Sequence, residues 1–167
     1  MIILGIDPGF SVTGFSILAA YPKTVLHDAG YLKLPVKEDL PSRINIFYQT
    51  LQEKIIKHQV THLALETPFL GKNTQSFLKL GYLRGTLYLL AAQHNLLIQE
   101  FTPREVKMAV TGFGAATKDQ VAAMIERLFP SIKTCNALAK QDVTDAIAIG
   151  LSGIWGIRST ASNIQSL

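Results

Sequence analysis

The feature that most constrains this chain is its beginning, where a short strand signal ends in a single carboxylate. The residues from Ile2 to Ile6 are apolar or glycine, Asp7 follows them, and Pro8-Gly9 then requires a turn. A short run of this kind, rich in β-branched residues and bounded by turn residues, is typical of a buried central strand. A lone carboxylate at the end of such a strand needs a hydrogen-bonding partner or a cation. An Asp in a turn can also accept hydrogen bonds from its own backbone, which would make Asp7 a purely structural residue. A functional site is favoured only if other carboxylates lie at similar strand or helix ends.

The composition indicates one folded domain with a mildly basic surface. The chain has 167 residues, of which 48% are hydrophobic, and this suffices for one domain with a sizeable core. The 16 Lys and Arg residues exceed the 12 Asp and Glu residues, giving a net charge of +4, which is compatible with a polyanionic partner. No apolar run approaches the roughly 20 residues that cross a membrane, and the N-terminus lacks the basic region of a signal peptide. Together with a single cysteine, these features predict a cytoplasmic protein without a membrane partner.

The hydrophobic periodicity predicts alternating strands and helices. A returning strand at 14–18 and a third strand signal at 25–34, with a polar turn expected at 28–30, indicate an antiparallel meander. The further predicted elements are strands at 61–66 and 96–101 and helices at 42–58 with Ser42 as N-cap, 74–95, 102–110, 117–129 and 142–157. Capping-box sequences begin at Thr102 and at Thr117.

Two glycines inside the helix predicted at 74–95 indicate a close neighbour. Gly81 and Gly85 are four residues apart, so they lie on one face of that helix. A glycine inside a helix costs about 1 kcal/mol relative to alanine. We therefore expect another element to pack closely against this face.

A second carboxylate ends the strand predicted at 61–66. Glu66 follows an apolar stretch, and Pro68 stops the strand. Strands separated by a crossover helix usually run parallel and are usually neighbours in the sheet. We therefore expect Asp7 and Glu66 to lie side by side at one edge of the sheet, beyond the carboxyl ends of the strands, where sites form in open α/β sheets.

Two more carboxylates begin the last predicted helix. Asp142 and Asp145 are three residues apart and share one face of its first turn. Acidic residues also favour helix N-termini, because they complement the helix dipole by about 0.3–1 kcal/mol each. That explanation is as good as a functional one for Asp142. It fits Asp145 less well, because the apolar run 146–149 follows directly.

Together the four carboxylates predict a site for divalent cations. Without a cation they would repel one another and lose hydration together. Mg²⁺ prefers oxygen ligands of this type, and two ions about 3.5–4 Å apart can stabilise both the attacking and the leaving oxygen of a phosphoryl displacement. No spacing of Cys and His residues suggests zinc. The residues therefore point to metal-assisted hydrolysis of phosphodiesters.

The motifs around these carboxylates resemble those of the RuvC family of bacterial Holliday-junction endonucleases, within the ribonuclease H-like superfamily. The resemblance covers residues 1–155. Its motifs are, in order, Gly5-Ile-Asp-Pro-Gly9 with Thr13-Gly14, Glu66, Phe69, Lys72-Asn73, Lys79-Leu-Gly-Tyr-Leu-Arg-Gly85, Val106-Lys107, Gly112-Phe-Gly114, Lys118 and Asp142-Val-Thr-Asp-Ala-Ile-Ala148. One such motif would be a weak signal, whereas all of them in this order and spacing are specific.

This resemblance implies an α/β fold of the ribonuclease H-like type, with a five-stranded mixed β-sheet flanked by α-helices. It implies that Asp7, Glu66, Asp142 and Asp145 are the catalytic residues and the ligands of two Mg²⁺ ions per active site, for which Mn²⁺ can substitute. The substrate would be four-way junction DNA, nicked symmetrically on two strands in homologous recombination and DNA repair. The implied partners are a second copy in a homodimer, whose two-fold symmetry suits a four-way junction, and the junction-binding and branch-migration proteins RuvA and RuvB.

The resemblance also implies a set of DNA-contacting residues. Phe69 would stack on an unpaired base near the crossover, an interaction worth about 1–3 kcal/mol, and Lys72 and Asn73 follow in the same loop. The alternative role for Phe69 is an aromatic that fills the core. Lys107 and Lys118 match lysines near the scissile phosphate, and Lys118 would stand at a helix N-terminus, which favours an anion.

Two positions depart from the family pattern. Phe10 stands where a small hydroxyl residue is common, so the loop after Asp7 is expected to be tighter or more apolar. Ser152-Gly153 stands where many members carry a His.

Three other functions share some of these features. A sugar-kinase or actin-type ATPase also begins with a strand and a phosphate-holding loop, but it needs a second such domain, for which this chain is too short. A non-catalytic junction binder would be expected to lack one of the four carboxylates. A related nuclease acting on structured RNA would keep all four and stays an alternative. We expect one RuvC-like nuclease domain at 1–157 and a polar C-terminal tail at 158–167.

Overall fold

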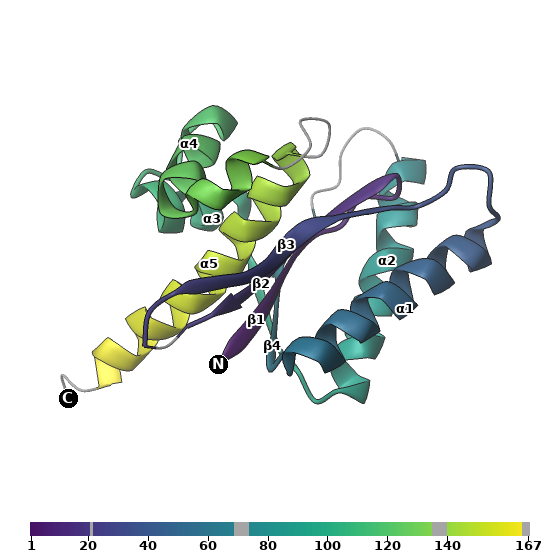
Figure 1. The fold of residues 1–167 in the computed structure, drawn as a ribbon, viewed down its shortest axis with the longest axis horizontal. Coiled ribbons are helices and arrows are strands. Elements are labelled where there is room, and N and C mark those ends of the chain that lie inside the picture. The colour runs from purple at the N-terminus through teal and green to yellow at the C-terminus, as the bar shows by residue number, and fades with distance from the viewer. Residues whose placement is uncertain (21, 69–73, 135–139, 165–167) are drawn as a thin grey trace.

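A five-stranded mixed β-sheet runs through the middle of the molecule, with helices on both of its faces (Figure 1). The computed structural model describes residues 1–20, 22–68, 74–134 and 140–164. The strands are β1 (Ile2–Asp7), β2 (Val12–Ala19), β3 (Val25–Lys33), β4 (His62–Glu66) and β5 (Leu97–Phe101). The helices are α1 (Leu40–His58), α2 (Thr74–Gln93), α3 (Pro103–Thr111), α4 (Lys118–Leu128) and α5 (Lys140–Ile164), and a short 3-10 helix spans Pro130–Thr134.

The strand order β3-β2-β1-β4-β5 makes the two strands that end in carboxylates central neighbours. β1 pairs antiparallel with β2, and β2 pairs antiparallel with β3, which confirms the predicted meander. β1 pairs parallel with β4, and β4 pairs parallel with β5. The sheet is therefore mixed, and its parallel half contains both strand-end carboxylates.

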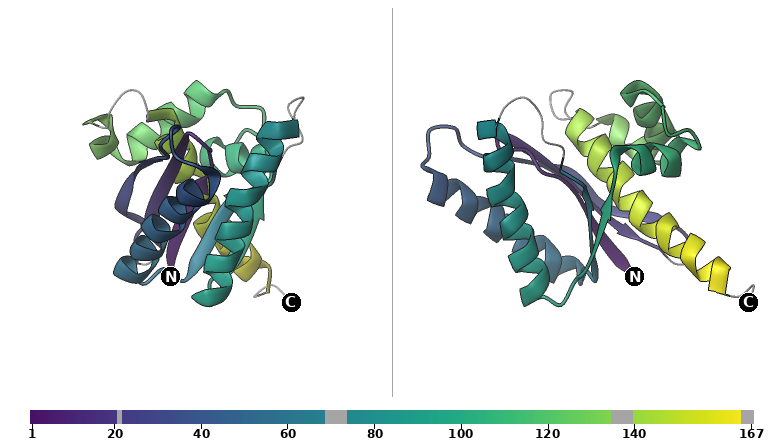
Figure 2. Two further views of the ribbon diagram at one scale, coloured as in Figure 1. Left: turned by 90° about the vertical axis from the view of Figure 1, so that its right-hand side faces the viewer. Right: turned by 180° about the vertical axis from the view of Figure 1, so that it is seen from behind.

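Helices cover the two faces of the sheet (Figure 2), and a separate apolar cluster packs on each face. On one face α1 and α2 bury side chains such as Phe47 and Leu87 against the strands. On the other face α5 crosses β1, β2 and β4, and α3 and α4 pack against α5. Successive residues of β1 serve both layers, because Ile3 belongs to the cluster under α5 and Leu4 to the cluster under α1 and α2. This is why the first strand carries almost no polar residue before Asp7.

Small residues allow α5 to lie very close to β1 and β2. A Cβ atom on Gly5 would overlap the backbone carbonyl oxygen of Ala146 and lie 2.6 Å from the backbone N of Gly150, and a Cβ atom on Gly14 would overlap the backbone carbonyl of Asp142. The buried hydroxyl of Ser16 donates a hydrogen bond to the carbonyl oxygen of Ala146 at 2.8 Å. The two glycines and this hydrogen bond thus fix the beginning of α5 on the sheet.

Two local predictions are wrong. The turn expected at 28–30 does not form, because β3 continues through it, and Asp28 instead accepts a hydrogen bond from Lys54 of α1 at 2.6 Å. The polar residue is thus satisfied by another element, which local sequence cannot reveal. The N-cap of α1 is Asp39, whose carboxylate accepts a hydrogen bond from the backbone N–H of Ser42 at 2.8 Å, so Ser42 is not the cap.

At the helix ends, two predicted capping boxes are confirmed and one predicted boundary differs. The capping boxes predicted at Thr102 and Thr117 are both present. α5 continues to Ile164, so the boundary expected at 157 falls inside a helix. No helix in the described ranges is long and apolar enough to cross a lipid bilayer.

The close neighbour predicted for Gly81 and Gly85 is not found within the described part of this chain. A Cβ atom on either glycine would meet no other atom within 4 Å. The face of α2 that carries them is exposed.

Candidate active site

The carboxyl ends of β1 and β4 place two of the predicted carboxylates next to each other. In the parallel ladder Ile6 pairs with Leu65. The next residues along the two strands are Asp7 and Glu66, so the predicted side-by-side placement is confirmed. Both residues are half-buried at the edge of the sheet.

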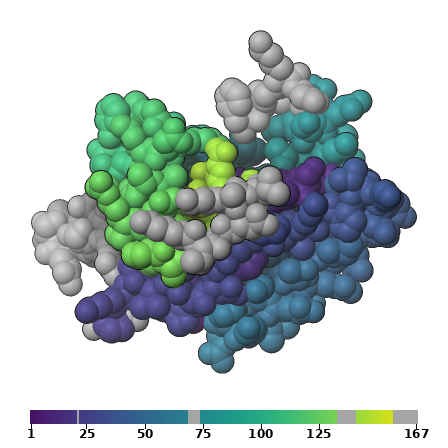
Figure 3. Space-filling view, turned by 45° about the horizontal axis from the view of Figure 1, so that its top comes forward, coloured from purple at the N-terminus to yellow at the C-terminus, as the bar shows by residue number. Residues whose placement is uncertain are grey.

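The first turns of α5 bring the other two carboxylates to the same end of the sheet. Asp7 pairs with Gly14 in the β1–β2 ladder, and Gly14 packs directly on the backbone of Asp142. Asp145 follows on α5 and lines a hollow together with Glu66. Figure 3 shows the yellow-green beginning of α5 between the green helices α3 and α4 and the teal helix α2. The structure thus brings all four predicted carboxylates together.

Burial and repulsion from neighbouring carboxylates raise the pKa of Asp7, Glu66 and Asp142. The pKa of Asp7 is raised from 3.8 to about 7, mainly by burial and further by the charges of Asp145, Glu66 and Asp142, against a lowering effect of Lys118. Burial and the charge of Asp145 also raise the pKa of Glu66 and that of Asp142 above their ordinary values. The four groups therefore lie within electrostatic reach of one another, and such a cluster favours a bound cation.

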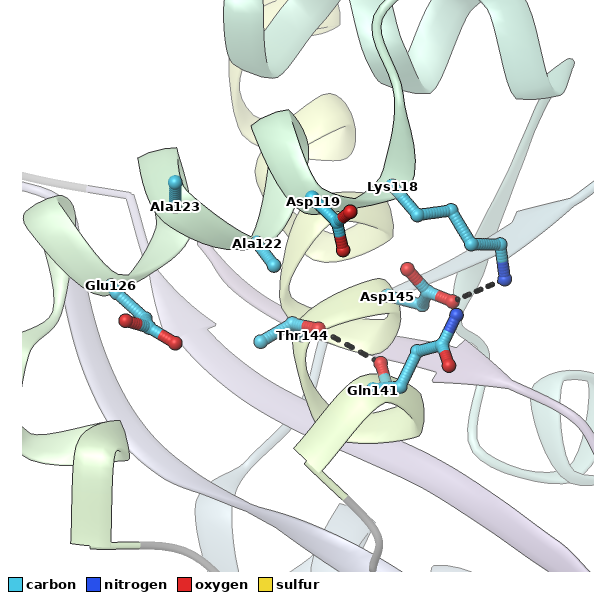
Figure 4. A pocket seen from close by; sticks show the side chains of 8 residues that line it. All are labelled: Lys118, Asp119, Ala122, Ala123, Glu126, Gln141, Thr144 and Asp145. Atoms are coloured by element: carbon cyan, nitrogen blue, oxygen red, sulfur yellow. Dashed lines mark hydrogen bonds and ion pairs between the residues drawn. The ribbon is translucent and has the colours of Figure 1, made fainter. Parts of the chain in front are cut away.

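Two lysines from neighbouring helices add positive charge to the cluster. Lys118, the first residue of α4, places its Nζ 3.2 Å from Asp145 Oδ2 (Figure 4). Burial by itself would lower the pKa of Lys118, but the charges of Asp145, Asp7 and Glu66 raise it. Lys107 of α3 lowers the pKa of Glu66 through its charge. Both lysines line the hollow of about 210 Å³ that also holds Glu66 and Asp145.

A second hollow of about 400 Å³ adjoins the first and lies between α4 and α5. Figure 4 shows Lys118 and Asp145 beside each other in this hollow, whereas Asp119 and Glu126 project from α4. Because Lys118 and Asp145 line both hollows, the acidic cluster is open on this side.

The donor set of the site fits divalent metal ions. All four residues offer carboxylate oxygens, which hard cations prefer, and a bound cation would offset the repulsion that raises the pKa of Asp7. Among the described residues, no three His, Cys, Asp or Glu side chains stand close enough to count as a metal-binding group. The fit therefore rests on the chemistry of the donor oxygens and not on a preformed coordination geometry.

The predicted DNA-contacting residues divide into two groups. Lys107 and Lys118 lie beside the carboxylates, as expected for residues near a scissile phosphate. Phe69, Lys72 and Asn73 lie outside the described residues, so their contacts with DNA stay predictions.

Arg43 is a residue of the site that the sequence reasoning missed. Its guanidinium carbon lies 4.0 Å from the centroid of the Phe10 ring, and its Nη2 donates a hydrogen bond to the carbonyl oxygen of Phe10. Lys79 Nζ lies 5.8 Å from the same ring. The loop after Asp7 is therefore held by α1 and α2. The signal that could have identified Arg43 is its position on the apolar stripe of α1, where it is buried.

The other departure from the family pattern lies away from the carboxylates. Ser152 is buried and donates a hydrogen bond to the carbonyl oxygen of Ala148 at 2.9 Å. A Cβ atom on Gly153 would lie 2.9 Å from Gln99 Oε1 and 3.1 Å from Ile3 Cδ1. The stretch is thus used to pack α5 on the sheet.

Metal-free Asp7→Asn is expected to be more stable than the wild type at pH 8, and the difference should shrink toward pH 5. The pKa of Asp7 is about 7 in the folded protein and 3.8 as a free carboxyl. Its contribution to stability is therefore fully present below about pH 4 and is lost as the pH rises through about 7. After allowance for partial exposure, we expect a gain of about 1–3 kcal/mol at pH 8.

The measurement is thermal unfolding followed by circular dichroism between pH 5 and pH 8 in the presence of a chelator. Glu53→Gln, on the exposed side of α1, is the control, and it should show no such pH dependence. A lower melting temperature for Asp7→Asn at every pH would mean that Asp7 supports the fold.

Comparisons with known proteins agree on one family. The model of the family "Crossover junction endodeoxyribonuclease RuvC" matches residues 3–153. The chain is 41% identical over 164 residues to RuvC of Chloroherpeton thalassium, covering 98% of this chain and 87% of that protein. It is 36% identical over 155 residues to RuvC of Rickettsia typhi, covering 92% of this chain and 97% of that protein.

Solved structures show the same fold. The structure of Thermus thermophilus RuvC superposes with a TM-score of 0.83 at 24% identity, covering 96% of this chain and 98% of that one. A second structure of that protein, in complex with a Holliday junction substrate, gives the same TM-score and covers 97% of its chain. The predicted α/β fold of the ribonuclease H-like type is therefore confirmed.

Proposed function

The chain belongs to the RuvC family of crossover junction endodeoxyribonucleases, and on this premise we propose that Asp7, Glu66, Asp142 and Asp145 form its active site. It is thus a metal-dependent endonuclease that resolves Holliday junctions in recombination and repair, as the family does. The observation that supports the site assignment is the convergence of the four carboxylates from β1, β4 and α5, where the charge of Asp145 helps to raise the pKa of Asp7, Glu66 and Asp142. We assign the nuclease domain to residues 1–157 and the tail to 158–167.

The four carboxylates would hold the metal through their oxygen atoms. We propose two Mg²⁺ ions per site, replaceable by Mn²⁺, because this donor set contains only hard oxygen ligands. Such ions, when bound, lower the pKa of a water molecule and offset the negative charge on a phosphate. Burial of Asp7 at the end of β1 keeps its carboxylate poorly hydrated, which strengthens its attraction for a cation.

The two lysines of the site complement the charge of the DNA backbone. Lys118 stands at the N-terminus of α4, where the helix dipole also favours an anion. Its Nζ is paired with Asp145 Oδ2 at 3.2 Å, and a phosphate that approached the carboxylates would offer it a second anionic partner. Lys107 of α3 lines the same hollow, and its charge acts on Glu66. We propose that these residues position the scissile phosphate over the carboxylates.

A nicking assay tests the function and its alternatives. The substrates are a four-way junction, a linear duplex and an RNA–DNA hybrid, each incubated with Mg²⁺ and with a chelator. We expect paired cuts in two opposing strands of the junction, and only when metal is present. Cutting of the hybrid in preference to the junction would favour a nuclease for structured RNA, and the absence of any cutting would contradict the proposal.

We propose that two copies of the chain pair through the exposed face of α2. This face carries Leu78, Tyr82 and Leu89, which are 56%, 38% and 51% exposed, at spacings that place them on one side of the helix. Gly81 and Gly85 lie on the same side with open space above them. Glycines there allow another helix to approach closely, and an isologous helix pair gives the two-fold symmetry that a four-way junction requires.

Leu89→Arg is expected to convert the dimer into a monomer, because each copy would bring a charge into an apolar contact. Sedimentation velocity measures the change, and the nicking assay should show single cuts in place of paired cuts. Ile56→Arg is the matched control, because Ile56 is 62% exposed on α1 and lies outside the proposed interface. If both variants sediment as the wild type does, the dimer uses another surface.

The cellular setting follows from the family. We propose that the enzyme acts on chromosomal junctions in the cytoplasm, together with junction-binding and branch-migration proteins of the RuvA and RuvB type.

A further inference from the structure

The loop between α3 and α4 presents an aromatic side chain to solvent on a well-fixed backbone. Phe113 is 60% exposed. Its N–H donates a hydrogen bond to Thr111 Oγ1 at 3.1 Å, and its carbonyl oxygen accepts one from the N–H of Ala116 at 3.0 Å. Gly112, with a φ of 73°, ends α3 just before it. The exposure of Phe113 is therefore imposed by the loop and does not reflect fraying.

Phe113 separates two hollows, and each of them carries an arginine. The first hollow, of about 540 Å³, is lined by Phe113 with Arg104 and Lys107. The second, of about 290 Å³, is lined by Phe113 with Arg127 of α4. Neither lining contains a carboxylate. The surface around Phe113 is thus basic with an apolar centre.

The two arginines of this surface form no ion pair with a described carboxylate, whereas Lys107 also lies near Glu66. No ion pair joins Arg104, Lys107 or Arg127 to an Asp or Glu within the described ranges. The nearest carboxylate in sequence, Glu105, accepts hydrogen bonds from the N–H and hydroxyl of Thr102 and lines a different hollow. Asp119 and Glu126 of α4 line the hollow beside Asp145 (Figure 4).

The surface is continuous with the active site. Pro103 and Lys107 line both the first hollow and the hollow that holds Glu66 and Asp145. A polymer whose reacting group lies at the carboxylates can therefore continue past Lys107 and over Phe113. The repeating negative charge that matches such a path is that of a nucleic-acid backbone.

We propose that Arg104, Phe113 and Arg127 form an outer DNA-contact surface, which holds the sugar–phosphate backbone of a junction arm beyond the scissile phosphate. The two arginines contact phosphates, and the Phe113 ring packs on the deoxyribose between them. Contacts of this type position the substrate and carry no sequence information. The inference rests on the proposed function, because it gives a binding surface to the junction arm that extends from the proposed active site.

The test compares a double variant with a matched control on junctions of two arm lengths. The variant is Phe113→Ala with Arg104→Gln. The control is Ile56→Ala with Lys57→Gln, which removes one exposed apolar side chain and one charge from α1. Fluorescence anisotropy measures the affinity for a long-armed and a short-armed junction without Mg²⁺, over a range of salt concentrations.

We expect the double variant to bind the long-armed junction roughly tenfold more weakly than the wild type. The slope of log affinity against log salt concentration should decrease by about one, because one phosphate contact is lost. On the short-armed junction the variant and the wild type should bind equally. The control should match the wild type on both substrates. Thermal unfolding of each variant identifies any loss of folded protein, and Phe113→Leu with Arg104→Lys should recover part of the affinity.

Three results would overturn the inference. One is an unchanged affinity of the double variant for the long-armed junction, and another is an equal loss on both arm lengths. The third is normal binding of naked junctions combined with defective cleavage only when a junction-binding protein is present, which would make the surface a protein interface. Failure of the proposed function is distinct, because the wild type itself would then not nick a junction.

Discussion

Asp7→Asn is expected to reduce the rate of junction nicking by about 10³-fold or more, while the affinity for the junction stays within about twofold of the wild-type value. The amide keeps the shape of the side chain but removes a charged oxygen ligand from the cluster. The lysines and arginines that face the DNA are untouched. Removing one negative charge from the site also weakens no contact with phosphate. Single-turnover nicking in Mg²⁺ and anisotropy measurements in a chelator give the two quantities.

Asp119→Asn is the matched control for this experiment. Asp119 is the neighbour of Lys118 at the beginning of α4 and lines the outer hollow, but it is not one of the four clustered carboxylates. We expect its nicking rate to stay close to the wild-type rate. Equal losses in the two variants would indicate a general effect of charge, and undiminished nicking by Asp7→Asn would refute the assignment of Asp7.

Gly14→Ala is expected to destabilise the protein by about 2–4 kcal/mol and to abolish measurable nicking. The new Cβ atom would overlap the carbonyl oxygen of Asp142 and lie 3.2 Å from its Cβ atom, so α5 would have to move away from β2. That movement displaces Asp142 relative to Asp7, which pairs with Gly14 in the ladder. The fold and the site are therefore damaged by the same methyl group.

Chemical denaturation measures the loss of stability, and nicking at a temperature where the variant is folded measures the loss of activity. Gly30→Ala in the adjacent strand β3 is the control, because its Cβ atom would meet only the edge of the Phe15 ring at 3.1 Å. We expect it to cost less than about 1 kcal/mol and to leave nicking intact. A Gly14→Ala protein that nicks at the wild-type rate would show that α5 does not need this close contact.

The parts of the fold predicted correctly from sequence depend on short-range patterns. The apolar runs before Asp7 and Glu66, with a helix between them, are sufficient to predict parallel neighbours. The capping boxes at Thr102 and Thr117 are likewise local and are both confirmed. Spacing along one helix placed Asp142 and Asp145 together at its beginning.

The parts that were missed depend on contacts between distant elements. Asp28 belongs to a continuous strand because Lys54 of α1 pairs with it. Arg43 supports the Phe10 loop because α1 crosses that end of the sheet. The position of Arg43 on the apolar stripe of α1 could have marked it as buried, but no local pattern encodes its contact with Phe10 or the contact of Lys54 with Asp28. For Gly81 a close neighbour was predicted, but the described part of the chain leaves open space there. A neighbour from a second copy of the chain would be consistent with both observations.

The order in which the carboxylates occur along the chain has a consequence for the cell. Asp7 and Glu66 are synthesised early, but Asp142 and Asp145 reach the sheet only when α5 docks on Gly5 and Gly14. A nascent polypeptide on the ribosome that has not yet extended through α5 holds only two of the four carboxylates of the proposed site. On that assignment, we expect such a chain to be inert toward chromosomal DNA, so that a chain aborted before α5 leaves no cutting activity behind.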